Sequence, residues 1–219
     1  MRQQPLRMTT DLTATFNELV KDILWPAFKR LGYKKSGNNF RYYDAAGWGK
    51  IVQFQKASYN SAAELSFTIN IGLYLLDYDY YLCGETSGQT FREPACVVRK
   101  RIGKLIGSKQ DEWFELTELS NKELLFKQLD GYFTQHIHPY LATVQGKEAI
   151  YAILLAGHCA DFPSVQIHML FRAGYQEAAL QMLRSEFAQS KSNKYYRATL
   201  RNLATELGLP AALWATEES

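Results

Sequence analysis

Residues 48–74, WGKIVQFQKASYNSAAELSFTINIGLY, decide the fold. In the second half of this stretch, hydrophobic residues alternate with polar or small ones, in the order Leu65, Ser66, Phe67, Thr68, Ile69, Asn70, Ile71, Gly72, Leu73 and Tyr74. A period of two is typical of a β-strand with one apolar and one polar face. The first half follows the same pattern, with Val52 and Phe54 on one face and Gln53 and Gln55 on the other. The stretch therefore predicts two strands joined by a polar loop.

The chain before this stretch predicts one helix and one more strand. Hydrophobic residues recur at helical spacing as far as Leu31, and Thr10 and Asp11 are good caps for the start of that helix. Pro26 falls inside it and predicts a kink or two abutting helices. Residues 33–43 then read as a strand that is interrupted near its middle. Short loops would join the three successive strands into an antiparallel meander.

The chain after this stretch predicts a loop, two further strands and a helix. Residues 75–91 lose their periodicity and gather Gly, Ser, Thr and Asp, which favours a long ordered loop. Residues 95–106 read as a fourth strand and residues 113–116 as one more short strand. Ser120, with Glu three residues later, fits the capping box of a central helix, and Pro139 would bend that helix.

The C-terminal part of the chain is predicted to be helical. The helices are expected at about residues 147–156, 164–173, 175–189 and 194–207. The fold class is therefore α+β, with a mainly antiparallel sheet of four to five strands packed on the N-terminal and central helices. Residues 1–145 would form this α+β domain, and residues 146–219 a helical region packed on it or on a partner.

The sharpest functional pattern is a pair of arginines on the fourth predicted strand. Arg99 and Arg101 are two residues apart, so they point to the same face. Neighbouring strands would bring further polar side chains to that face, namely Gln53, Gln55, Thr68, Asn70 and Arg41. Guanidinium groups bind carboxylates and phosphates bidentately, and amides orient a ligand by hydrogen bonds. The pattern predicts an anion- or peptide-binding site; the alternative is a solvated face, or one covered by the C-terminal helices.

Composition and charge narrow the class of protein. Of the 219 residues 47% are hydrophobic and 14% aromatic, which is enough for a substantial core. The net charge is +3, with 16 Lys/Arg against 9 Asp/Glu in residues 1–109. Basic residues with interleaved aromatics in that half could bind nucleic acid, but no RNA-binding motif or zinc finger accompanies them, so nucleic acid is disfavoured.

The sequence also bears on compartment and membrane. Cys83, Cys96 and Cys159 are odd in number and scattered, which disfavours a disulfide framework and favours a reduced cytoplasm. The first ten residues have no apolar core of the kind a signal peptide needs. The longest apolar run, residues 150–156, is too short to cross a membrane. We expect a cytoplasmic protein without a membrane span.

Patterns for metal binding and catalysis are missing from the sequence. His136 and His138 lie two residues apart, a spacing that does not place both on one helix face, and neither they nor the group His158, Cys159 and Asp161 match a metal-ligand spacing. The chain has no nucleophile elbow and no glycine-rich phosphate loop. Paired acids such as Asp77 and Asp79, or Asp111 and Glu112, lie in polar segments and are expected to be solvated. The sequence thus predicts no metal, no cofactor and no catalytic residue.

Several motifs together resemble a known family. They are FKRLGYKKSGNNFRYY, VQFQKASYN, FTINIGLY, VVRKRIGKL and WFEL, in that order. The pattern is similar to an uncharacterised bacterial family known as domain of unknown function 4304, over about residues 16–145. Tyr33 stands where the family often has Phe, and Ala57 interrupts the Gln-Lys-Ser run. The resemblance implies an intracellular α+β domain and brings no catalytic residues.

Two functional hypotheses follow. The first is a non-catalytic cytoplasmic binding or interaction protein that uses the polar sheet face to hold a protein partner or a small anion. The second is an enzyme of unrecognised type, in which Arg99 and Arg101 would orient an anionic small molecule; weak nucleic-acid binding is a further alternative. An enzyme should hold an acid or base beside the arginines in a deep pocket, whereas a binder should show a groove or a flat patch.

Overall fold

The structure, a computed structural model, describes residues 11–210. These residues form two compact units, and each unit contains three separate segments of the chain. The first unit contains residues 11–44, 49–72 and 99–145, and the second contains residues 45–48, 73–98 and 146–210. Residues 73–98 therefore belong to the same unit as the C-terminal helices.

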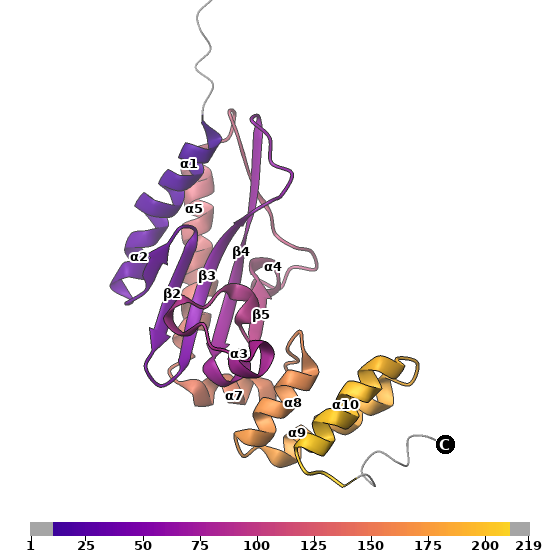
Figure 1. Cartoon of the computed structure of the whole chain (residues 1–219). Helices are drawn as coiled ribbons and strands as arrows, with labels where there is room; N and C mark the ends of the chain where they lie inside the picture. The colour runs from indigo at the N-terminus through magenta and orange to yellow at the C-terminus, as the bar shows by residue number, and fades with distance from the viewer. Residues whose placement is uncertain (1–10, 211–219) are drawn as a thin grey trace, which may run out of the picture. The chain divides into compact units, whose positions relative to one another are not determined.

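One sheet runs through the described residues (Figure 1). Its strands follow the order β1-β2-β3-β4-β5, and β6 also pairs with β4. The strands are β1 (Lys34–Ser36), β2 (Asn39–Asp44), β3 (Trp48–Lys56), β4 (Glu64–Leu75), β5 (Val98–Arg101) and β6 (Phe114–Thr117). The pairs β1–β2 and β4–β6 are antiparallel. This sheet confirms the predicted α+β class.

Residues 34–44 form a hairpin, so the single interrupted strand expected there is wrong. Ser36 pairs with Asn39, which leaves a two-residue turn between the strands. Gly37 in that turn has a φ of 57°, a left-handed conformation that glycine adopts without steric cost. The interruption in the sequence pattern is therefore the turn itself.

The N-terminal helix consists of three consecutive segments. They are α1 (Leu12–Glu18), a π-helical segment η1 (Leu19–Leu24) and α2 (Trp25–Arg30). The Asp11 carboxylate caps α1 by accepting hydrogen bonds from the backbone N–H groups of Thr13 and Ala14 at 2.9 and 3.1 Å. Pro26 has no N–H to donate into the helical ladder, and the π-helical segment ends just before it. The predicted kink is thus a local change of helix type.

The central helix repeats this arrangement. It consists of α5 (Lys122–Tyr132), a π-helical segment η4 (Phe133–Ile137) and α6 (His138–Ala142), with Pro139 in the first turn of α6. Its cap is Asn121, whose side chain accepts a hydrogen bond from the backbone N–H of Leu124 at 3.0 Å. The prediction of Ser120 as cap is wrong, because the Ser120 hydroxyl instead accepts from the backbone N–H of Thr117 at 2.8 Å.

Aromatic rings fill the space between these helices and the sheet in the first unit. Phe16 of α1 meets Phe67 of β4 with ring centroids 5.0 Å apart, and Phe28 of α2 meets Phe40 of β2 at 4.9 Å. Phe133 of the central helix contacts Phe28 at 4.8 Å. Figure 1 shows α1 and α5 on the same face of the sheet. The predicted packing of the N-terminal and central helices on the apolar sheet face is confirmed.

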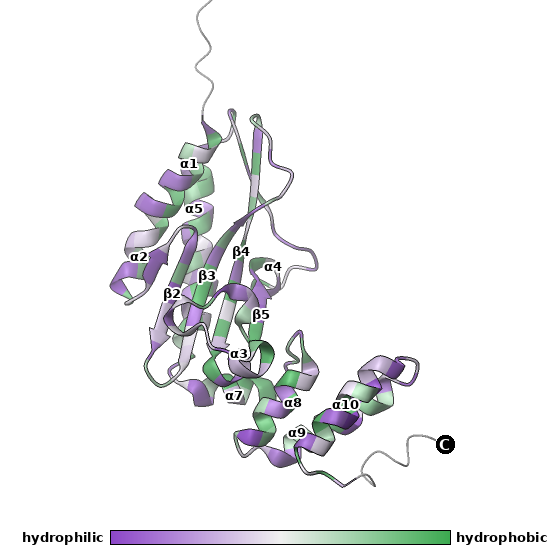
Figure 2. Ribbon diagram, in the orientation of Figure 1, coloured by the Kyte–Doolittle hydropathy of each residue, from purple (hydrophilic) through white to green (hydrophobic). Residues whose placement is uncertain are grey.

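The opposite face of β4 is also buried. Figure 2 shows hydrophobic and hydrophilic residues alternating along the strand, as the sequence predicts. Yet Ser66, Thr68 and Asn70 are 5%, 0% and 4% exposed. The alternative of a solvated polar face is therefore wrong for β4, and these polar groups need partners inside the protein.

Two further segments differ from their predicted secondary structure. Residues 76–83, expected in a loop, form α3 (Leu76–Cys83), which ends at Gly84 with a φ of 77°. The fourth strand ends earlier than expected, because the chain turns into α4 (Ile102–Leu105) directly after β5. Gly103 explains that turn: a Cβ on this residue would lie 2.5 Å from the carbonyl oxygen of Gln110, so α4 can approach residues 110–112 only with glycine there.

The second unit contains α3 and the predicted C-terminal helices. These are α7 (Lys147–Leu155), α8 (Pro163–Arg172), α9 (Gln176–Gln189) and α10 (Lys194–Glu206). The Tyr81 ring of α3 stacks on His168 of α8 at 4.1 Å, and the Arg197 guanidinium of α10 donates to the carbonyl of Phe187 in α9 at 2.9 Å. Within residues 11–210, no helix combines the length and apolarity that a membrane span requires.

Candidate functional site

The seven predicted site residues share one face of the sheet. Phe40, Phe54 and Phe67 form the ring cluster against the helices, and the Lys100 ammonium lies 4.9 Å from the ring centre of Tyr140 in α6. Because side chains alternate along a strand, their neighbours point to the other face. Those neighbours are Arg41, Gln53, Gln55, Thr68, Asn70, Arg99 and Arg101.

Amides occupy the centre of this polar face. The Asn70 side-chain amide on β4 donates to the Gln53 Oε1 of β3 at 3.0 Å and to the Gln55 Oε1 at 2.6 Å. Asn70 is buried, whereas Gln53 is partly buried and Gln55 is exposed. The predicted grouping of these three amides on adjacent strands is thus present, and they satisfy one another.

The chain that follows α4 covers another part of the polar face. The Thr68 hydroxyl donates to the backbone carbonyl of Glu112 at 2.7 Å. A buried hydroxyl needs such a partner, because an unsatisfied one costs about 1–3 kcal/mol. Thr68 therefore anchors residues 110–113 over the sheet and is used structurally.

Arg101 forms an accessible cluster at the edge of this face. Its guanidinium is paired with the carboxylate of Asp111 and lies 5.8 Å from the ring centre of Trp113. The two charged side chains are 39% and 43% exposed, so solvent screens their attraction. Arg41 and Arg99 are partly buried, and each interacts with other groups of the protein. Asp111, expected to be solvated, orients Arg101.

A buried lysine lies on the opposite face, where sequence reasoning did not look for a functional group. The Lys50 ammonium donates to the carbonyl of Leu141 at 2.8 Å and lies 5.5 Å from the Tyr42 ring centre. Burial lowers the pKa of Lys50, because desolvation disfavours the charged form. In the same region the Tyr140 hydroxyl is buried without a partner among the described residues, and burial raises the pKa of Tyr140 to about 12.

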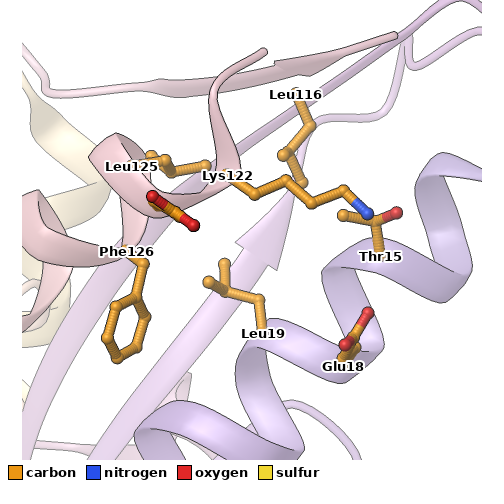
Figure 3. Close-up of a pocket in the computed structure, with 8 residues that line it drawn as sticks. Thr15, Glu18, Leu19, Leu116, Lys122, Leu125 and Phe126 are labelled. Atoms are coloured by element: carbon orange, nitrogen blue, oxygen red, sulfur yellow. The ribbon is translucent and has the colours of Figure 1, made fainter.

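A small apolar groove lies between the helices and the sheet of the first unit (Figure 3). It has a volume of about 210 Å³. Leu19 of η1, Leu116 of β6, and Leu125 and Phe126 of α5 line its apolar part, and Figure 3 shows them converging from three separate elements. The charged residues at the groove are Glu18, Lys122 and Glu123, all of them exposed.

Exposed leucines lie close to this groove in the chain. Leu119, in the turn between β6 and α5, is 96% exposed, and Leu124, on the first turn of α5, is 66% exposed. Exposed large apolar residues beside an apolar groove are typical of interaction surfaces. Residues 116–126 contain this signal in the sequence as the leucines of LTELSNKELLF, but only the packing of α1 beside α5 creates the groove.

Several of the histidines and acidic residues considered in the sequence analysis contact other groups of the protein. His136 and His138 each contact an aromatic ring, of Tyr132 and Phe133 respectively. Within residues 11–210, no group of three or more His, Cys, Asp or Glu is placed to hold a metal ion. Asp79 contradicts the expectation of a solvated acid, because it is 1% exposed in the second unit.

Comparisons with known proteins give the family of this chain. No curated protein and no solved structure matches the chain. The family described as "Domain of unknown function (DUF4304)" matches residues 24–143, which is more than half of the chain. This range contains β1 to β6 and the helices from α2 to α6, with the polar face and most of the groove. The chain therefore belongs to the DUF4304 family, as its sequence motifs indicated.

Proposed function

We propose that this protein is a cytoplasmic, non-catalytic interaction protein whose groove between α1 and α5 receives one large apolar side chain of a protein partner. The observation that supports this is the apolar groove of Figure 3, with charged residues around it and two exposed leucines close by in the chain. Aromatic and aliphatic anchors that fill such pockets supply much of the binding energy of protein interfaces. The free thiols of Cys83, Cys96 and Cys159 suit a reducing compartment.

The size of the groove favours a side chain over a whole small molecule. Sites for small molecules commonly measure about 300–1,000 Å³, and this groove measures about 210 Å³. Its charged residues include two carboxylates, Glu18 and Glu123, and one ammonium group, Lys122. We therefore propose a partner segment in which a Trp, Phe or Leu is flanked by a basic residue, because a cation beside the anchor would complement the carboxylates.

A random peptide library displayed on phage tests this proposal directly. Selection on the full-length protein should enrich peptides that carry one large apolar residue next to Lys or Arg. Synthetic versions of those peptides should bind the Glu123→Lys variant at least about tenfold more weakly, which corresponds to about 1.4 kcal/mol. Fluorescence anisotropy of labelled peptides gives both affinities.

Glu148→Lys is the matched control for this experiment. Glu148 is the second residue of α7, as Glu123 is of α5, and both are exposed and follow a lysine. The two variants therefore make the same change of charge and place it at the same position in a helix. Equal affinities of the selected peptides for the two variants would refute the assignment of the groove, and a selection without enrichment would refute peptide binding.

Arg101 supports a second candidate, the binding of a small anionic ligand on the polar sheet face. The Trp113 ring and the Asp111 carboxylate hold its guanidinium in place while it stays partly exposed. Native mass spectrometry of the purified protein should then detect a bound anion that the Arg101→Ala variant loses and the Lys104→Ala variant keeps. Lys104 is an exposed cation three residues away. Loss of the anion from both variants, or its retention in both, would exclude Arg101 as the ligand-binding group.

A further inference from the structure

The second unit contains a larger hollow beside α3. It has a volume of about 750 Å³, which lies in the range of small-molecule sites. The residues that line it include Asp79, Cys83, Ser87, Arg92, Pro94 and Phe162. They come from α3, from the segment that follows it, and from the residue before α8.

Asp79 is a buried acid, and one of its two carboxylate oxygens accepts no hydrogen bond from the described residues. Its Oδ2 accepts a hydrogen bond from the Tyr74 hydroxyl at 2.8 Å and another from the backbone N–H of Ser87 at 2.7 Å. Its Oδ1 is buried and has no hydrogen-bond partner among the described residues. An unsatisfied buried acceptor is expensive and uncommon in folded proteins. Asp79 therefore offers a strong acceptor to a donor group bound in the hollow that it lines.

The framework around Asp79 is rigid. Tyr74 is fully buried and stacks on Phe91, with ring centroids 4.2 Å apart and planes inclined by 16°. The Thr90 hydroxyl donates to the carbonyl of Ser87 at 2.8 Å, next to the N–H that Asp79 holds. The carboxylate is thus fixed by a buried aromatic stack on one side and by a structured turn on the other.

Arg92 supplies the opposite charge in the same hollow. It is exposed, and within the described part of the chain its guanidinium pairs with no carboxylate. A simple cation would be repelled by Arg92, and a simple anion would leave Asp79 without a donor. Phe162, which is 50% exposed, and Pro94 add apolar surface to the lining of the hollow.

We propose that this hollow binds a free amino acid. The ammonium group of the ligand would donate to Asp79 Oδ1, its carboxylate would bind the Arg92 guanidinium, and its side chain would contact Phe162 and Pro94. Opposite charges on one small molecule complement the Asp79 carboxylate and the Arg92 guanidinium. A metal ion fits less well, because a single carboxylate oxygen does not make a coordination shell. This proposal concerns the second unit and is independent of the groove described above.

Two cysteines provide a direct test. Cys83 lines the hollow and is exposed, whereas Cys159 is an exposed thiol of the same unit that lies outside it. The full-length protein is alkylated with iodoacetamide in the presence of each standard L-amino acid except cysteine, and peptide mass spectrometry follows both thiols. At least one amino acid should slow alkylation of Cys83 several-fold and leave Cys159 unchanged. If none of them does so at millimolar concentration, the proposal is refuted.

Modified ligands and variants then test the two contacts. The methyl ester of the protecting amino acid lacks the carboxylate and its N-acetyl form lacks the ammonium group, so neither should protect Cys83. Arg92→Ala should abolish protection, and Arg184→Ala, which removes an exposed arginine of α9 outside the hollow, should keep it. Asp79→Asn should also abolish it; where that variant does not fold, the ester and Arg92→Ala decide the outcome. Equal protection by ester and free acid, or unchanged protection in Arg92→Ala, would overturn the proposal.

Discussion

Replacing Asn70 by Ala tests whether the amide network holds β3 and β4 together. The change removes two hydrogen bonds, to Gln53 at 3.0 Å and to Gln55 at 2.6 Å, from a position that is 4% exposed. A hydrogen bond contributes about 0.5–1.5 kcal/mol net, so we expect the free energy of unfolding to fall by about 1–3 kcal/mol. For a chain of this size, that corresponds to a decrease in Tm of about 2–12 °C.

A double-mutant cycle between Asn70 and Gln55 measures the interaction itself. Urea unfolding of Asn70→Ala, Gln55→Ala and the double variant, followed by circular dichroism, should give a coupling energy of about 1 kcal/mol. Ser66→Ala is the matched control on the same strand and face, because its hydroxyl donates only to the exposed Glu64 at 3.3 Å. Ser66→Ala should lower the free energy of unfolding by less than Asn70→Ala does. Additivity of the Asn70 and Gln55 changes within about 0.3 kcal/mol would refute the network.

Four further substitutions test the stability of the protein, each measured by urea unfolding. Tyr140→Phe removes a buried hydroxyl that has no hydrogen-bond partner within residues 11–210, and it should be neutral or stabilising by up to about 1 kcal/mol near neutral pH. Because the folded protein keeps the Tyr140 proton up to about pH 12 while the unfolded chain loses it near 10, this variant should also lose less stability as the pH rises above 10. Gly103→Ala should destabilise, since its Cβ would lie 2.5 Å from the Gln110 carbonyl oxygen, whereas Gly131→Ala, in α5 with no atom within 4 Å, should stabilise by about 0.5–1 kcal/mol. Asp11→Ala should cost about 1 kcal/mol through loss of its two cap hydrogen bonds. A stable Gly103→Ala, or an Asp11→Ala without effect, would contradict the backbone approach or the cap.

Much of the fold could be predicted from hydrophobic spacing. The alternation in residues 65–73 predicted the strand and its faces, because one side packs on Phe16 and its neighbours. The C-terminal helices were predicted within one or two residues, since apolar spacing and glycine stops mark them. Helix α3 could not be predicted: its adjacent buried residues, Tyr78 and Asp79, do not make an apolar stripe, and the helix depends on packing against α8.

The sites were less predictable, because they depend on tertiary partners. Strand parity correctly placed Asn70, Gln53 and Gln55 together, since cross-strand neighbours are set by local geometry. The pairing of Arg101 with Asp111 needed the turn through α4, which the sequence reading continued as a strand. Asp79 was expected in solvent, because nothing in its local sequence shows that Tyr74 and the Ser87 backbone enclose it.

The interleaved path of the chain has a practical consequence for recombinant work on this family. A fragment cut at residue 143, where the family match ends, would retain Tyr81 and the rest of α3 but lose His168 and α8, which pack against it. Apolar surface that the native protein covers would then face water, and the fragment would be prone to aggregation. The boundaries of the family match are therefore a poor guide to a fragment that folds on its own, and expressed fragments should include the helices through α10.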